Sequence, residues 1–172
     1  GQYTGNLRNG GEHVRFEAVD AAAIADFTYG DDLPWPDGAD GDGYSLIMSG
    51  ANPADPLEWR MSTTIDGNPG TADTTPFSGT VGELISYALV AGPTPGLVVE
   101  SFTVSIVQNL GADDAVIAVE FSTDTVTWTP APADQLLSLT NNGDGAATQV
   151  WKSPWSVDTT PKQFARVTVE LR

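Results

Sequence analysis

Three consecutive pieces of sequence decide the fold: Leu136-Leu137-Ser138-Leu139, then Asn141-Asn142-Gly143-Asp144-Gly145, then Thr148-Gln149-Val150-Trp151-Lys152. Asn and Gly adopt a positive φ at low cost, so tight hairpin turns favour them. Runs rich in leucine or in β-branched and aromatic residues flank this turn on both sides. The stretch therefore predicts two antiparallel strands joined by a hairpin.

Short apolar runs between turn signals continue in both directions from this hairpin. Near the start of the chain, Val14, Phe16 and Ala18 alternate with polar residues, which is typical of a strand with one buried face. A short helix is expected near residues 82–90, ended by Gly92-Pro93. The further strands are expected at residues 13–19, 24–29, 44–48, 58–62, 97–107, 115–121 and 164–171. The predicted fold class is all-β.

The composition changes between residues 66 and 80. The segment from Asp66 to Pro76 has almost no large apolar residue, and its Gly, Pro, Asn and Asp are typical of a linker. We therefore predict two subdomains with β-sandwich elements, residues 1–73 and residues 74–172.

The charge of the chain excludes several functional classes. Its 172 residues include 23 Asp and Glu, 7 Lys and Arg, one His and no Cys, and the formal net charge is −16. Without Cys there is no disulfide, thiolate zinc site or Cys nucleophile. A strongly negative field disfavours nucleic-acid phosphates, and no apolar stretch of about 18 residues predicts membrane insertion. No signal peptide is expected in this form of the chain.

Six pieces of the first subdomain occur in a characteristic order and spacing. They are Gly5-Asn6-Leu7-Arg8-Asn9-Gly10-Gly11-Glu12, Phe27-Thr28-Tyr29, Pro34-Trp35-Pro36, Asp40-Gly41-Asp42-Gly43-Tyr44-Ser45-Leu46, Trp59-Arg60 and Gly67-Asn68-Pro69-Gly70. In this order, residues 1–73 resemble the C-terminal half of a bacterial lamin-tail domain. The resemblance implies an immunoglobulin-like β-sandwich whose first strands would precede Gly1.

That arrangement would leave one apolar face of the first subdomain short of its usual partner. The face would consist of Val14, Phe16, Ile24, Phe27 and Leu46. We expect it to be covered by residues 77–172, by a strand from a neighbouring subunit, or by a separate chain. The chain is accordingly expected not to act as an isolated monomer.

The second subdomain carries four further pieces of this kind. They are Leu84-Ile85-Ser86-Tyr87-Ala88-Leu89, Gln108-Asn109-Leu110-Gly111-Ala112-Asp113-Asp114, Val119-Glu120-Phe121-Ser122-Thr123-Asp124 with Trp128, and Gln163-Phe164-Ala165-Arg166-Val167. With them, residues 77–172 resemble a C-terminal domain of large secreted proteins of planctomycete and verrucomicrobial type. The resemblance implies an extracellular or cell-surface accessory module without catalytic activity.

Three tryptophans are candidate carbohydrate-binding residues, because a flat indole can stack on a sugar ring. Trp35 lies between two prolines, and Trp151 and Trp155 would lie on one strand face about 13 Å apart, unless Pro154 breaks the strand. The alternative is that Trp35 plugs the end of the sandwich and that Trp151 and Trp155 are packing or subunit-contact residues. Trp59 and Trp128 are expected to be half-buried.

Asp37, Asp40 and Asp42 on a glycine-rich loop are candidate Ca²⁺ ligands, because Ca²⁺ takes several oxygens at flexible spacing. The alternative is that they are turn residues and that no cofactor binds. Asp113-Asp114 and Asp31-Asp32 are expected in solvated turns, and His13 on the polar side of its strand.

The predicted function is that of a non-catalytic, extracellular structural or adhesive module, one that assembles with copies of itself or with other protein chains. A carbohydrate-binding module appended to a secreted enzyme, with polysaccharide as partner, is the alternative. A small hydrolase is a third reading and would require a concave site with clustered titratable groups.

Overall fold

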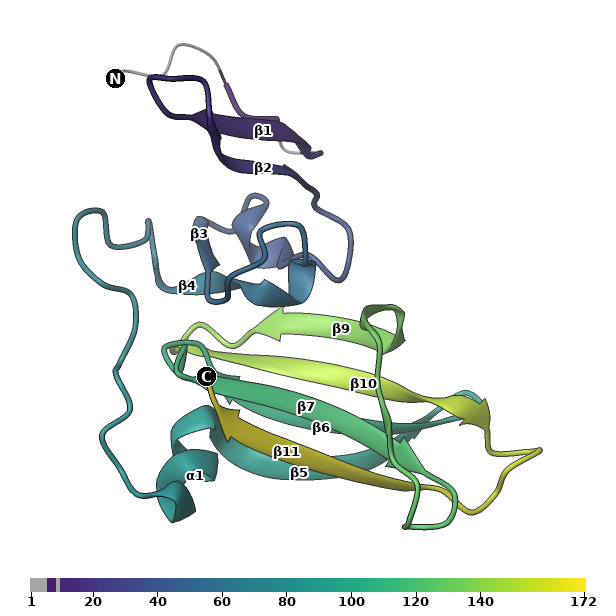
Figure 1. Ribbon diagram of the computed structural model, residues 1–172. Helices are drawn as coiled ribbons and strands as arrows, with labels where there is room; N and C mark the ends of the chain where they lie inside the picture. The colour runs from purple at the N-terminus through teal and green to yellow at the C-terminus, as the bar shows by residue number, and fades with distance from the viewer. Residues whose placement is uncertain (1–5, 9) are drawn as a thin grey trace.

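The computed structural model describes residues 6–8 and 10–172 and is mostly antiparallel β-structure (Figure 1). The broad prediction of a β protein with one short helical segment is therefore confirmed. Predictions that fall on residues 1–5 and 9, among them Gly5 and Asn9 of the lamin-tail-like pattern, lie outside the described residues.

The first half of the chain forms two separate two-stranded sheets. β1 (Glu12–Glu17) pairs with β2 (Ala23–Tyr29), which confirms the predicted hairpin, and Val14 lies opposite Phe27. β3 (Tyr44–Met48) pairs with β4 (Trp59–Ile65). Short 3-10 turns at Asp37–Ala39 and Pro56–Glu58 lie in the loops before β3 and β4.

The second half forms two larger sheets. In one, the order β5-β6-β10-β9 joins β5 (Leu89–Val98), β6 (Ser101–Asn109), β10 (Ala146–Ser156) and β9 (Leu136–Asn141). In the other, the order β11-β7-β8 joins β11 (Phe164–Leu171), β7 (Ala115–Ser122) and β8 (Thr129–Pro130). We call residues 84–171 the two-sheet unit. The predicted turn between β9 and β10 is confirmed, with positive φ at Gly143 and Gly145.

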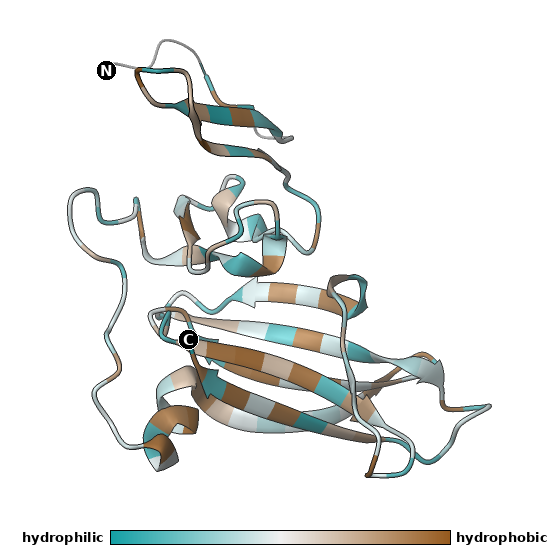
Figure 2. Ribbon diagram, viewed as in Figure 1, coloured by the Kyte–Doolittle hydropathy of each residue, from teal (hydrophilic) through white to brown (hydrophobic). Residues whose placement is uncertain are grey.

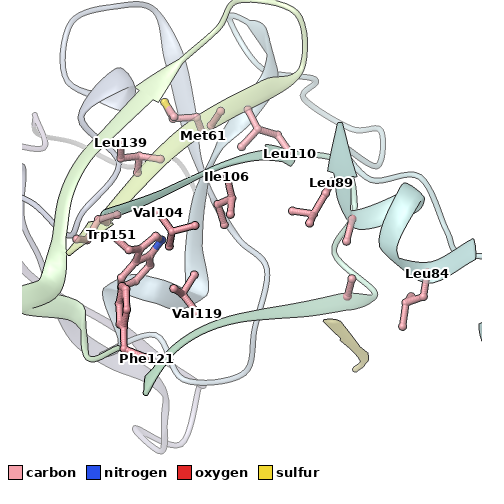
Figure 3. Close-up of a cluster of buried hydrophobic side chains, with 14 residues drawn as sticks. Met61, Leu84, Leu89, Val104, Ile106, Leu110, Val119, Phe121, Leu139 and Trp151 are labelled. Carbon is pink, nitrogen blue, oxygen red and sulfur yellow. The ribbon is translucent and has the colours of Figure 1, made fainter. Parts of the chain in front are cut away.

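A buried cluster between the two sheets is the core (Figure 3). Phe121 of β7 is fully buried and meets Phe102 of β6 edge to face, with 6.0 Å between ring centroids. Met61 of β4 is also fully buried and belongs to this cluster, so β4 is anchored to the two-sheet unit. Apolar and polar residues alternate along much of the strands, as a sheet with one buried face requires (Figure 2).

Two predicted elements differ from the structure. Residues 97–107 are not one strand, because the chain turns at Val99, where φ is 53°, and divides them between β5 and β6. The helix α1 (Leu84–Ala88), preceded by a 3-10 turn at Val81–Glu83, ends earlier than predicted. β5 begins immediately after it and runs through Gly92-Pro93, which an edge strand tolerates because one row of its N–H groups has no partner in the sheet.

The β1–β2 hairpin stands away from the two-sheet unit, with β3 and β4 between them (Figure 1). Its Phe27 packs on Trp59 of β4, with ring centroids 5.3 Å apart. Phe16 and Ile24 remain 57% and 72% exposed. The expected apolar face is therefore covered by this chain only at its Phe27 end.

Candidate functional site

A buried arginine stands at the centre of a hydrogen-bonded ion cluster. Arg60 of β4 is only 5% exposed, and each of its five N–H groups has an acceptor. Nε and Nη2 donate to the two carboxylate oxygens of Asp113 at 2.6 and 2.7 Å. Nη1 donates to Asp73 Oδ2 at 2.7 Å and to the carbonyl of Met61, and Nη2 also donates to the carbonyl of Asp73.

One carboxylate of this cluster, that of Asp73, has further hydrogen-bond donors. Asp73 accepts hydrogen bonds from the backbone N–H and the hydroxyl of Thr63. Burial acts to raise the pKa of the Asp73 carboxyl, but the bonds from Arg60 and Thr63 outweigh it, so that pKa lies below its ordinary value. Burial likewise acts to lower the pKa of Arg60, and the bonds to Asp113 and Asp73 raise it overall. Arg60 and Asp73 are therefore held in their ionised forms.

This cluster corrects the prediction that Asp113-Asp114 is a solvated turn. Asp113 is bound bidentately by Arg60, and Asp114 Oδ2 accepts the backbone N–H of Phe77 at 2.7 Å. The segment predicted as a linker is thereby tied to the two-sheet unit, and Thr75 also donates its N–H to the carbonyl of Gly111. Because every arginine donor is already used, the cluster joins parts of the chain and offers no free donor to a ligand.

The three candidate tryptophans lie in different surroundings. Trp35 is half-buried against Trp59, with 5.9 Å between ring centroids, a contact of the kind expected for a plug. Trp151 is 6% exposed and belongs to the core, and its Nε1 donates to Gln149 Oε1. The assignment of Trp151 as a stacking residue is therefore wrong, because no sugar can reach its ring faces.

Trp155 lies beside an open depression of about 450 Å³. β10 continues through Pro154, but its register against β6 shifts between Lys152 and Ser156. Trp155 is half-buried and packs against the core cluster to which the buried Trp151 belongs. Glu100, Asp134, Gln135 and Lys152 line the same depression, and the side-chain oxygen of Gln135 is buried without a hydrogen-bond partner there.

The structure does not gather Asp37, Asp40 and Asp42 into a metal site. They lie on an exposed turn, which packs inward through Pro36 and Gly38. Within residues 6–8 and 10–172, no three His, Asp or Glu side chains are placed to hold a metal ion. The three-carboxylate Ca²⁺ prediction is therefore not supported by their positions. His13 is exposed, as predicted, and its Nε2 lies 2.6 Å from Oδ1 of Asp26.

Sequence reasoning missed both the Arg60 cluster and the polar lining of the depression. Arg60 stands between Trp59 and Met61 in a strand, and a lone cation in such a run is the signal that could have suggested a buried ion pair. Its partner Asp113 is 53 residues away in sequence, and no local pattern identifies it. Glu100, Asp134 and Lys152 come together only through the turn after β5 and the bulge in β10.

Comparisons with family models, with curated proteins and with solved structures find no match for this chain. In the described part of the chain, no helix combines the length and the hydropathy needed to cross a membrane.

The Arg60 cluster predicts a large effect of Arg60→Met. The substitution leaves Asp73 and Asp113 partly buried without their cation, and breaking a buried ion pair from one side costs about 3–5 kcal/mol. Arg15→Met is the matched control, because Arg15 also pairs with two carboxylates, Glu17 and Asp26, but on an exposed surface. Urea unfolding should show a much lower midpoint for Arg60→Met and little change for Arg15→Met. Equal effects of the two substitutions would contradict this account.

The lowered pKa of Asp73 predicts a defined acid sensitivity. A carboxylate with a lowered folded pKa adds stability above its unfolded pKa, near 3.8, and this contribution is lost as the pH falls through the folded pKa. The free energy of unfolding should therefore decrease as the pH drops below about 4. In Asp73→Asn this decrease should be less steep, with a slope smaller by at most about 1.4 kcal/mol per pH unit. Asp158→Asn, on an exposed turn, should keep the wild-type slope. If Asp73→Asn keeps it too, the ionised carboxylate does not stabilise the fold.

Proposed function

We propose that this chain is a non-catalytic structural or adhesive module of a secreted or cell-surface protein, and that it works by assembling with copies of itself or with other chains. The observation that carries the proposal is the exposed apolar surface of the β1–β2 hairpin. Val19, Phe16 and Ile24 are all exposed within nine residues of an acidic chain. Exposed apolar groups concentrated on one projecting element are typical of a protein interaction site.

The strand order of the two-sheet unit supports an immunoglobulin-like module. In immunoglobulin domains one sheet has the strand order A-B-E-D and the other contains C and F as neighbours. β5-β6-β10-β9 corresponds to the first order, and β7 and β11 take the places of C and F. The lamin-tail resemblance implies such a sandwich within residues 1–73, but that part of the chain forms two separate two-stranded sheets, and the immunoglobulin-like order occurs in the two-sheet unit instead. Together with the resemblances of residues 1–73 and 77–172, this order supports the proposal of an extracellular accessory protein with two subdomains divided near residue 73.

Self-association of the whole chain tests the structural proposal. We expect sedimentation velocity at increasing concentration to show assemblies for the wild type, and we expect Phe16→Ser to weaken them because it removes an exposed apolar group. Val126→Ser is the control, since Val126 is also an exposed apolar residue, even more exposed than Phe16, but lies in the loop between β7 and β8. A wild-type chain that stays monomeric at every concentration, with no other chain bound, contradicts the proposal.

The depression beside Trp155 favours carbohydrate binding as a second candidate function. An aromatic ring next to carboxylates, an amide and an ammonium group is a combination that can stack on a sugar and bind its hydroxyls. Trp155, Glu100, Asp134, Gln135 and Lys152 provide this combination. Unlike Trp151, Trp155 keeps part of its surface open to solvent.

Retention on a panel of polysaccharide gels tests this second function. Trp155→Ala should abolish retention while leaving the circular dichroism spectrum unchanged. Trp128→Ala should not, because Trp128 is half-buried outside the depression, under the guanidinium of Arg166. If no gel retains the wild type, or if Trp155→Ala binds as well as the wild type, Trp155 is a packing residue only.

A further inference from the structure

The two-sheet unit is open along one side, between β5 and β11. Among the described strands β11 pairs with β7 alone, so the backbone groups on its other edge face no strand. On the other side of the opening, Leu97 of β5 pairs with Phe102 of the neighbouring strand β6, and Phe102 packs against the core. Cross-strand partners point to the same face of a sheet, so Leu97 lies on the core face. It is nevertheless 63% exposed, because nothing in the opposite sheet covers it.

Other residues define the limits of this opening. Ala165, Val167 and Val169 of β11 pack against the core but are only partly buried. The helix α1 closes the end of this side near the start of β5, where Leu84 and Ala88 are buried (Figure 1). The uncovered part therefore runs along Phe164–Val169 of β11 and Pro95–Leu97 of β5. We call it the open slot.

We propose that the open slot accepts the β1–β2 hairpin of a second copy of this chain, with one hairpin strand pairing along β11 and Phe16 covering Leu97. An unpaired sheet edge binds an added strand through backbone hydrogen bonds, and alternate side chains then fill the core face. This inference rests on the proposed assembly function, and it names both surfaces of the contact.

Charge complementarity favours the hairpin as the occupant. The segment 162–172 is the most basic part of a chain with net charge −16. It contains three cationic residues, Lys162, Arg166 and Arg172, and one acidic residue, Glu170. Arg166 already pairs with Glu120 and Arg172 with Glu58, whereas Lys162 lies over the ring of Phe164. The hairpin segment 12–29 is acidic, with Glu12, Glu17, Asp20 and Asp26 against Arg15. Opposite charges of this kind orient a contact and disfavour wrong partners.

The geometry also requires that the donor be another molecule. The hairpin and β11 lie at opposite ends of the structure, with β3, β4, β9 and β10 between them (Figure 1). A hairpin therefore cannot fill the slot of its own chain without leaving its contact with Trp59. A contact between two different surfaces repeats from one molecule to the next, and repeated addition gives a closed ring or an open chain of subunits.

A mixing experiment tests the pair of surfaces directly. Phe16→Asp damages only the hairpin, and Leu97→Asp damages only the slot. Both residues are exposed in the free chain, so melting temperatures should stay near that of the wild type. Each variant alone should associate about 100-fold more weakly than the wild type. An equimolar mixture should form a dimer and stop there, because it has one intact hairpin and one intact slot.

Engineered cysteines provide an independent measurement, since the chain has none of its own. Phe16→Cys mixed with Leu97→Cys should form a disulfide-linked heterodimer under mild oxidation, well above the level reached by Val126→Cys with Leu97→Cys. If Phe16→Asp prevents assembly but Leu97→Asp does not, or if the cysteine pair links no better than its control, the slot is not the acceptor and only this inference fails. If the wild type does not associate at all, both this inference and the proposed assembly function fail.

Discussion

One guanidinium group determines how the two halves of this chain are joined. Arg60 lies on β4, and its partners come from the segment before the helix, at Asp73, and from the turn before β7, at Asp113. Met61, the next residue, points to the other side of the strand and enters the core of the two-sheet unit. At Arg60 and Met61, β4 is therefore buried on both faces, by an ion cluster on one and by apolar packing on the other.

This anchoring explains why the first hairpin projects. Because β4 is fixed, Trp59 is fixed with it, and the rings of Phe27 and Trp35 pack against Trp59. These aromatic contacts hold the hairpin by its Phe27 end and leave Phe16 and Ile24 facing solvent. The exposed apolar groups that support a role in assembly are thus presented from an anchored base. The cost of burying a charge is offset only with full hydrogen bonding, which Arg60 has.

Sequence reasoning found the features that depend on neighbouring residues. The turn at residues 141–145, the first hairpin and the strands near residues 44–48 and 164–171 follow from alternation and turn chemistry, and the structure has them. It failed for features that depend on contacts between residues far apart in the sequence. A positive φ at a β-branched residue such as Val99 is rare, so the break between β5 and β6 has no local signal. Trp151 and Trp155 were both candidate stacking residues, but Trp151 belongs to the buried core, whereas Trp155 packs against that core and stays half-buried.

The Arg60 cluster should make β3 and β4 part of the same cooperative unit as the larger sheets. Native-state hydrogen exchange measures this directly, residue by residue. We expect slow amides of β3 and β4 in the wild type to open with the same free energy as those of β6 and β10. In Arg60→Met they should open at lower free energy while β6 and β10 keep their protection relative to global unfolding. Wild-type β3 and β4 that open independently, or an exchange pattern unchanged by Arg60→Met, would contradict the account.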